Sequence, residues 1–139
     1  MTQLQEFLQG DNYAHHLNIE LLEVSNGYAR AKMEVRDYHL NTHKTVHGGV
    51  IFSLADAVFA VASNSHGVAA VAINANISFI RATSSGLLLA EAIEQSLNPK
   101  LATYEVKVTA GDGELVAVFQ GMVYRKSKRV DGKDDQKAG

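Results

Sequence analysis

The sequence predicts an α+β domain in which one long central helix packs against a curved antiparallel sheet of about six strands. The first observation behind this prediction is an apolar segment, 50–62, whose only polar residues are Ser53 and Asp56. A helix that is apolar on all sides is normally buried, and this segment is well short of the roughly 20 residues that cross a bilayer. The second observation is that alternating, strand-like runs joined by short turns lie on both sides of it.

The length and composition describe one globular domain. The chain has 139 residues, 46% hydrophobic and 20% charged, which is enough for one core but not for two. A net charge of −2 gives no reason to expect nucleic acid or an anionic membrane as a partner. The absence of cysteine excludes disulfides and thiolate metal sites. The first ten residues lack the basic and long apolar parts of a secretory signal, so a cytoplasmic location is expected.

The first part of the chain is predicted to hold a short helix and a hairpin. Apolar residues recur at helical spacing within 2–10. The runs 17–24 and 28–35 have strand character, and Asn26-Gly27 between them is a strong hairpin signal. In the second run, small and apolar residues alternate with polar ones, which predicts one buried face.

A polar loop, 36–46, is expected to lead into the central helix. It contains His39 and His43, four residues apart but not on a helix, so no metal site is predicted there. The helix should begin at His-Gly-Gly, 47–49, where free backbone N–H groups can bind negative charge.

After the helix the period changes to two, and a meander of four strands is predicted. Its connections are short, which favours antiparallel neighbours. Residues 1–126 are therefore expected to be a single domain, and the charged segment 127–139 a flexible tail. The four predicted strands are 68–82, 87–97, 101–110 and 114–124, with turns at 83–86, 98–100 and 111–113.

Gly48 and Asp56 are the candidate chemical groups of the helix. The amide N–H at a helix start can stabilise an oxyanion, an effect of roughly 2.7–4 kcal/mol per donor. A carboxylate can activate water as a general base or attack directly as a nucleophile. Asn41 can add a second donor, and His47 can orient the loop or the substrate. Together these groups describe acyl transfer to water.

The spacing of Gly48 and Asp56 predicts a site shared by two chains. Along one helix they are about 12 Å apart and about 80° around the axis, so they cannot both contact one small reacting group. If both act on one bond, they come from two chains packed in antiparallel fashion around a two-fold axis.

Each of these residues also has a purely structural interpretation. Asp56 can hold a buried N–H or cap a neighbouring loop, because structural networks also bury carboxylates. His47 can cap the helix, and Asn41 can be an ordinary loop residue. The residue types alone leave these alternatives open.

A family resemblance favours the chemical interpretation. Asn41, HGG at 47–49, LAD at 54–56 and ASNS at 62–65 closely resemble the hotdog-fold thioesterases of the phenylacetate-pathway (PaaI) type. The similarity covers most of residues 10–126. It implies the hotdog fold, pairing into dimers and often tetramers, and hydrolysis of acyl- or aryl-acyl-coenzyme A. No separate cofactor is implied, since coenzyme A is part of the substrate.

The resemblance also assigns roles to individual residues. It implies an oxyanion amide at Gly48, a carbonyl-polarising amide at Asn41, an adjacent histidine at His47, and a catalytic carboxylate at Asp56 of the partner subunit. Some relatives hold the water with a Ser or Thr on the following strand, where this chain has Ala72.

The remaining expectations concern substrate binding. Asn74 is a candidate replacement for the missing hydroxyl. Coenzyme A carries phosphates that basic residues must meet, and Arg81 and Lys100 are the first choices, with Arg125 and Lys126 close to strand ends as well. Phe52 and Phe79 are candidates for the acyl pocket. Each of these residues can also be ordinary surface or core.

Two other functions fit a hotdog domain. One is a dehydratase or hydratase, which pairs a histidine with an acid in a different motif. The other is a non-catalytic acyl-CoA binding or sensing module.

Overall fold

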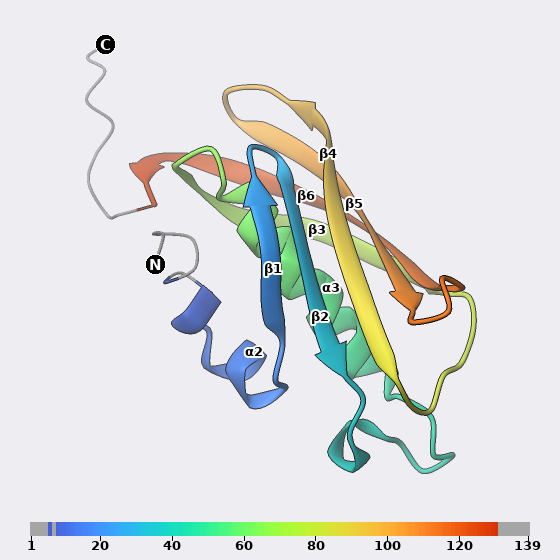
Figure 1. Cartoon of the computed structure of the whole chain (residues 1–139). Coiled ribbons are helices and arrows are strands. Elements are labelled where there is room, and N and C mark those ends of the chain that lie inside the picture. The colour runs from blue at the N-terminus through green and yellow to red at the C-terminus, as the bar shows by residue number, and fades with distance from the viewer. Residues whose placement is uncertain (1–5, 7, 131–139) are drawn as a thin grey trace.

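The predicted central helix is present, and one curved sheet packs against it (Figure 1). The structure is a computed structural model that describes residue 6 and residues 8–130. Helix α3 (Gly48–Ser63) begins two residues before and ends one residue after the predicted apolar segment. Within the described residues, no helix is long and apolar enough to span a membrane.

The described residues form one antiparallel sheet, whose strand order is β1-β2-β4-β5-β6-β3. This confirms the predicted fold class, an α+β hotdog domain with one long helix and a six-stranded sheet. The strands are β1 (Glu20–Ser25), β2 (Tyr28–Glu34), β3 (Val68–Phe79), β4 (Leu87–Leu97), β5 (Leu101–Ala110) and β6 (Leu115–Arg129).

The predicted four-strand meander is wrong in the position of its first strand. β3 pairs with β6 at the far edge of the sheet rather than with β4. The segment 80–86, predicted to be strand end and tight turn, instead crosses the end of the domain. It is held there by hydrogen bonds from Val46 N–H to Thr83 O (2.8 Å) and from Val35 N–H to Gly86 O (2.8 Å).

β6 is longer than predicted. It passes its expected end at residue 124 and continues to Arg129, because Arg125 and Arg129 pair with Ala70 and Val68 of β3. Residues 127–129 of the predicted tail therefore belong to the sheet. Residues 131–139 lie outside the described part of the chain.

Most of the predicted helix at 2–10 also lies outside the described residues. A second helix, α2 (Asn12–His16), was not predicted. Asp11 caps it by accepting a hydrogen bond from the Ala14 N–H at 3.0 Å. Ala14 and Leu17 are buried, so this single turn anchors the N-terminal segment to the domain.

Small side chains on the inner face of the sheet let α3 approach closely. The predicted alternation in β2 and β5 is confirmed, since their inward positions are buried. The buried alanines of this face include Ala29, Ala31, Ala90, Ala92 and Ala102.

One stripe of α3 is only partly covered by its own chain. Its members are at least partly exposed and recur at helical spacing, so they share one side of the helix. This stripe, which consists of Gly49, Phe52, Ser53, Asp56 and Ala60, is a side of the helix that its own chain leaves at least partly exposed.

The two edges of the sheet differ in charge. The edge strand β1 is bound to β2 by ion pairs, Glu20–Lys32 at 3.8 Å and Glu23–Arg30 at 3.5 Å. β3, the other edge (Figure 1), contains no charged residue in its sequence VAAVAINANISF. Long uncharged edges favour pairing with another strand, and charged edges oppose it. The large apolar side chains that β3 exposes are Val71, Ile73 and Phe79.

Candidate functional site

The loop before α3 is organised by the side chain of Asn41. Its Oδ1 accepts hydrogen bonds from the His43 N–H at 2.9 Å and from the Thr45 N–H at 3.2 Å. These donors identify the oxygen of the amide. The Asn41 NH2 group donates no hydrogen bond within the described part of the chain, so it is free to bind a carbonyl oxygen.

His39 fixes the same loop from the inside, a role that the sequence analysis did not assign. It is buried; its Nδ1 accepts from the Arg36 N–H at 2.9 Å, and its Nε2 lies 3.1 Å from Leu17 O. Because Nδ1 accepts, Nε2 carries the proton and donates. Burial lowers the pKa of His39, which keeps the ring neutral.

His47 is the N-cap of α3. Its Nδ1 accepts the Gly49 N–H at 2.9 Å, and its backbone N–H donates to His39 O at 2.8 Å. The first N–H groups of a helix have no partner inside the helix. With the Gly49 N–H bound by His47, the Gly48 N–H remains without a partner in the described residues.

A hollow of about 230 Å³ lies beside Gly48. The Phe79 ring packs so closely that a Cβ at position 48 would lie 3.2 Å from Phe79 Cζ. Ile51 of α3 and Arg81 also line this hollow. The structure therefore brings three of the predicted residues, Gly48, Phe79 and Arg81, to one place at the start of the helix.

Asp56 lies two helical turns further on, in the partly covered stripe of α3. Burial raises the pKa of its carboxyl above the ordinary value, and the charge of Asp11 raises it further. Within the described residues, no hydrogen bond or ion pair reaches this carboxylate. Phe52 is one turn before Asp56 on the same stripe, and its ring packs edge-on against Phe119 with centroids 5.3 Å apart.

The other predicted substrate-binding residues lie away from Gly48. Asn74 of β3 pairs with Met122 of β6. The residue before Met122, Gly121, faces the Phe59 ring of α3 on the inner side of the sheet. Since neighbouring side chains alternate between faces, Asn74 points to the outer face of the sheet. Lys100 lies at the opposite end of the domain, in another hollow beside the turn between β4 and β5.

Arg81 is already engaged by acidic groups. Its guanidinium lies 3.4 Å from Asp112 and 4.0 Å from Glu114. Such exposed pairs are weak, typically about 0.2–1 kcal/mol, so they can exchange for a phosphate.

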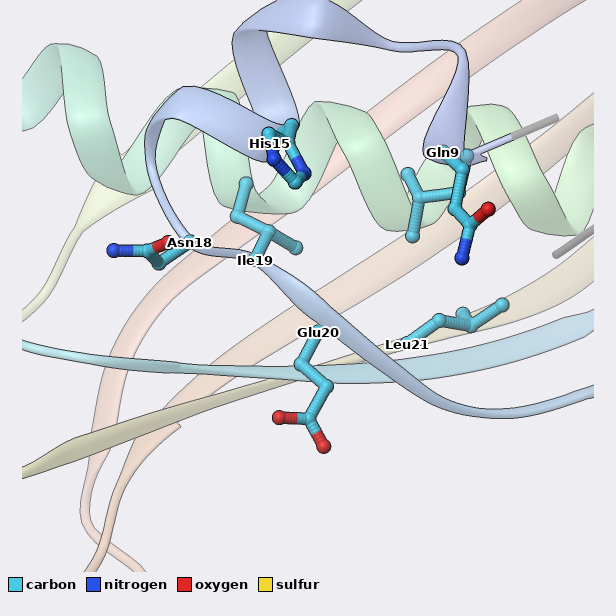
Figure 2. Close-up of a pocket in the computed structure, with 7 residues that line it drawn as sticks. Gln9, His15, Asn18, Ile19, Glu20 and Leu21 are labelled. Carbon is cyan, nitrogen blue, oxygen red and sulfur yellow. The ribbon is translucent and has the colours of Figure 1, made fainter. Parts of the chain in front are cut away.

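A cavity of about 580 Å³ lies between the N-terminal segment and β1 (Figure 2). His15, Ile19 and Leu21 are among the residues that line it. None of the predicted site residues does, so this cavity is separate from the Gly48 hollow.

A second group of titratable side chains lies at the other end of α3. Glu94 Oε2 is 2.6 Å from His66 Nε2 and accepts from the Tyr104 hydroxyl at 2.7 Å. Burial raises the pKa of Glu94, but these hydrogen bonds outweigh it and the net shift is downward. Burial, together with Glu94, raises the pKa of Tyr104. The hydrogen bonds of Glu94 thus connect the loop after α3, through His66, to β4 and β5.

Comparison with known proteins identifies the family. Residues 43–117 match the model of the Thioesterase superfamily. The acyl-coenzyme A thioesterase PaaI of Escherichia coli is 36% identical over 125 residues, which are 89% of this chain and 86% of that protein. The structure of E. coli PaaI, from the phenylacetic acid degradation operon, superimposes with a TM-score of 0.84 at 34% identity, covering 87% of this chain and 88% of that one.

A second solved structure gives the same result. A mutant of the phenylacetic acid degradation protein PaaI of Thermus thermophilus superimposes with a TM-score of 0.80 at 38% identity. The match covers 84% of this chain and 100% of that chain. The chain therefore belongs to the thioesterase superfamily and is a hotdog-fold hydrolase.

Proposed function

We propose that this protein is an acyl-CoA thioesterase that hydrolyses acyl- or aryl-acyl-coenzyme A to the free acid and coenzyme A. The observation that carries the proposal is the Gly48 N–H at the start of α3, which has no partner among the described residues and lies beside a hollow. Asn41 of the preceding loop, which is not among the residues that line this hollow, is proposed to supply a second donor. Two donors of this kind suit the oxygen of a thioester carbonyl, which becomes an oxyanion when it is attacked.

The attacking group is proposed to come from a second copy of the chain. Gly48 and Asp56 of one α3 are about 12 Å apart, too far to act on one carbonyl. Asp56 has no partner among the described residues and lies in the partly covered stripe, where a neighbouring helix can pack. The uncharged β3 edge, which can pair with the same edge of a second copy around a two-fold axis, supports this arrangement. A dimer is thus the minimal active unit, and pairing of two dimers remains a prediction.

The reaction then follows from the position of the groups. Asp56 of the partner subunit takes a proton from water as the water oxygen attacks the carbonyl carbon. Alternatively, its carboxylate attacks that carbon and displaces the thiolate, and water then hydrolyses the mixed anhydride to the free acid and the Asp56 carboxylate. The Gly48 N–H and the Asn41 amide hold the oxyanion. The C–S bond breaks, the sulfur leaves as the coenzyme A thiol after protonation, and the acid is released. His47 contributes by holding the Gly49 N–H, which leaves Gly48 for the substrate.

Phe52 and Phe79 are proposed to contact the acyl group, because each flanks one of the reactive positions. An aromatic wall at both sites favours aryl or medium-length acyl chains. The phenylacetate role of the PaaI relatives and a cytoplasmic location stay predictions for this chain.

The test is thiol release from a panel of acyl- and aryl-acyl-CoAs by the wild type and the isosteric Asp56→Asn variant. Removing a general base costs about 10²–10⁴ in rate. Glu23→Gln, which alters an acid on the β1 edge, is the matched control and should leave the rate unchanged. Equal rates for wild type and Asp56→Asn would contradict the proposal. CoA binding without thiol release would instead favour a binding module, and water addition to an enoyl-CoA would favour a hydratase.

A further inference from the structure

The partly covered stripe of α3 carries one hydroxyl group, that of Ser53, close to the Asp56 carboxyl. Ser53 is three residues before Asp56, and side chains three apart on a helix are neighbours, with Cβ atoms about 5–6 Å apart. Helical side chains lean toward the N-terminus, so the carboxyl of Asp56 leans over the turn that contains Ser53. Both residues are partly exposed. The two oxygen-bearing side chains therefore share one open part of the helix surface.

The hydrogen of the Ser53 hydroxyl is already used. It is donated to the Gly49 carbonyl oxygen, at a distance of 2.7 Å between the two oxygens. A hydroxyl has one hydrogen and two lone pairs, so Ser53 can only accept a further hydrogen bond. The ionised carboxylate of Asp56 can also only accept, and within the described part of the chain no hydrogen bond reaches it. Two neighbouring acceptors suit a ligand that donates two hydrogens, and water is the smallest such molecule.

The spacing of the two side chains also fits one water. Hydrogen bonds between oxygens are about 2.7–2.8 Å long, so a water that donates to both side chains joins oxygens about 4–5 Å apart. Neighbouring side chains on a helix provide such a separation. With both hydrogens directed at the helix, the lone pairs of the water point away from it, toward the space in which a second copy of the chain can pack. This orientation suits attack on a carbonyl that the second copy holds.

No other side chain of the stripe can hold that water beside Asp56. Gly49, Phe52 and Ala60, its remaining members, have no polar side-chain atom. Asn74, the candidate from the sequence, points to the outer face of the sheet. Ser53 is therefore the side chain that the stripe offers to a water at Asp56.

We propose that Ser53 is a further catalytic residue, whose hydroxyl accepts a hydrogen bond from the attacking water while the other hydrogen of that water points to Asp56 of the same chain. The water oxygen bonds to the thioester carbon held by the other chain, and one proton passes to Asp56. The carbonyl electron pair moves to the oxygen that the Gly48 N–H binds. The second hydrogen stays on the attacking oxygen, and Ser53 keeps its own proton on the bond to Gly49 O. This inference rests on the proposed thioesterase function and on its route through water.

The first test measures thiol release by Ser53→Ala and Ser53→Thr. In Ser53→Ala, kcat should fall about tenfold, equivalent to about 1.4 kcal/mol. KM should not change, because the water is not part of the substrate, and the factor should be the same for aryl and alkyl acyl groups. Ser53→Thr keeps the hydroxyl and the bond to the preceding turn, so it should keep most of the rate. An unchanged kcat for Ser53→Ala, or a loss confined to KM or to one acyl class, overturns the inference.

A matched control separates catalysis from folding. Ser63 lies at the other end of α3 and also donates its hydroxyl to the preceding turn, at 3.2 Å from Ala60 O. Ser63→Ala should keep the wild-type kcat. Alanine is the best helix former, so Ser53→Ala should unfold at a Tm no lower than that of the wild type. A lower Tm with an unchanged kcat would show that the Ser53 hydroxyl is only structural.

The second test asks whether Ser53 and Asp56 act on the same water. Residues that act as a unit are not additive. Ser53→Ala should therefore cost nothing further when Asp56 is already asparagine, so that the double variant and Asp56→Asn have the same residual rate. A further tenfold loss in the double variant would show that the two groups act independently, and overturns the shared water.

The third test asks whether both groups come from one chain. Hetero-dimers of a Ser53→Ala chain and an Asp56→Asn chain are purified with two different tags. Their only carboxylate at position 56 lies in the chain without the hydroxyl, so kcat should be about one-twentieth of the wild-type value, from half the sites at about a tenth of the rate. Hetero-dimers of wild type and Asp56→Asn are the control and should keep half. Half the wild-type kcat in the first hetero-dimer overturns the assignment to one chain.

The same measurements distinguish this inference from the proposed function. If Asp56→Asn loses thiol release while Ser53→Ala keeps the wild-type rate, the thioesterase proposal stands and the role of Ser53 is overturned. If the wild type releases no thiol from any acyl-CoA, both are overturned. A loss in both variants, with the shared residual rate of the double variant, supports both.

Discussion

The Phe59 ring of α3 lies directly on the backbone of Gly121 in β6, so that a Cβ at position 121 would be 2.6 Å from Phe59 Cζ. This contact sets the distance between the helix and the sheet. The contact requires glycine at position 121, because a side chain there would push against the Phe59 ring. That ring cannot easily move, since it also packs against Tyr104 and Phe119, at centroid distances of 5.8 and 5.3 Å.

Gly121→Ala is therefore expected to destabilise the domain. The ring cannot move away without disturbing its aromatic neighbours, and overpacking of this kind costs about 1–3 kcal/mol. Chemical denaturation measures the change. Gly111→Ala is the matched control, since a Cβ there would meet only Leu87 at 3.8 Å. An unchanged free energy of unfolding for Gly121→Ala would show that the helix can shift freely.

The rate should depend on pH through Asp56. The carboxyl is reactive when ionised, and burial followed by the charge of Asp11 raises its pKa. kcat/KM is expected to fall on the acidic side with an apparent pKa above the ordinary value of an aspartate. Asp11→Asn should move that limb of the pH–rate profile to lower pH, and an identical profile would exclude Asp11 as a contributor.

Asp56→Asn is expected to stabilise the fold at neutral pH. A carboxyl whose pKa is raised on folding binds more protons in the folded state, so stability falls as pH rises from the unfolded to the folded pKa. The asparagine amide of the variant carries no charge, so its burial does not lower the stability of the fold as pH rises. Thermal unfolding should give a higher Tm for the variant near neutral pH and a smaller difference in acid. A lower Tm at neutral pH would indicate that the carboxylate has a structural partner.

His39 should give a pH dependence of the opposite sign. Its pKa is lowered in the folded state, chiefly by burial. Its contribution is therefore complete above the unfolded pKa of about 6.5 and is lost as pH falls toward the folded value. His39→Asn is expected to cost about 1–3 kcal/mol near neutral pH and to flatten the acid loss of stability. The exposed His43, changed to Asn, is the control and should do neither.

Much of the fold could be predicted because it is local. β4 and β5 begin and end at the predicted residues, since alternation and turn residues define both. The position of β3 could not be predicted, because the link 80–86 is compatible with a tight turn or with a crossing. The crossing depends on hydrogen bonds to Val35 and Val46, which are distant in sequence.

In the candidate site, too, local features could be predicted from the sequence and long-range contacts could not. Residue type and spacing made Gly48 and Asp56 candidates, and the family resemblance favoured chemical roles for them and for Asn41 over purely structural ones. That His47 binds the Gly49 N–H and leaves Gly48 free required coordinates. The partners of Arg81 are about thirty residues away, so no local pattern indicates them.

A charge placed in β3 should separate the proposed dimer. Ile73→Lys puts an ammonium group on an exposed edge position, where charges oppose strand pairing. The variant is expected to be monomeric by light scattering and to lose thioesterase activity. Leu22→Lys makes the same change on β1 and should retain the wild-type mass and rate. A dimeric Ile73→Lys variant would place the interface elsewhere.

The difference between the two edges also limits how far such an assembly can grow. A sheet joined through β3 would present β1 at both of its outer ends. A third chain is not expected to pair with β1. This strand is short and bulged, and it carries the Glu20–Lys32 and Glu23–Arg30 ion pairs. Edge-to-edge growth therefore stops at two copies, and the uncharged strand can serve assembly without becoming a seed for fibrils.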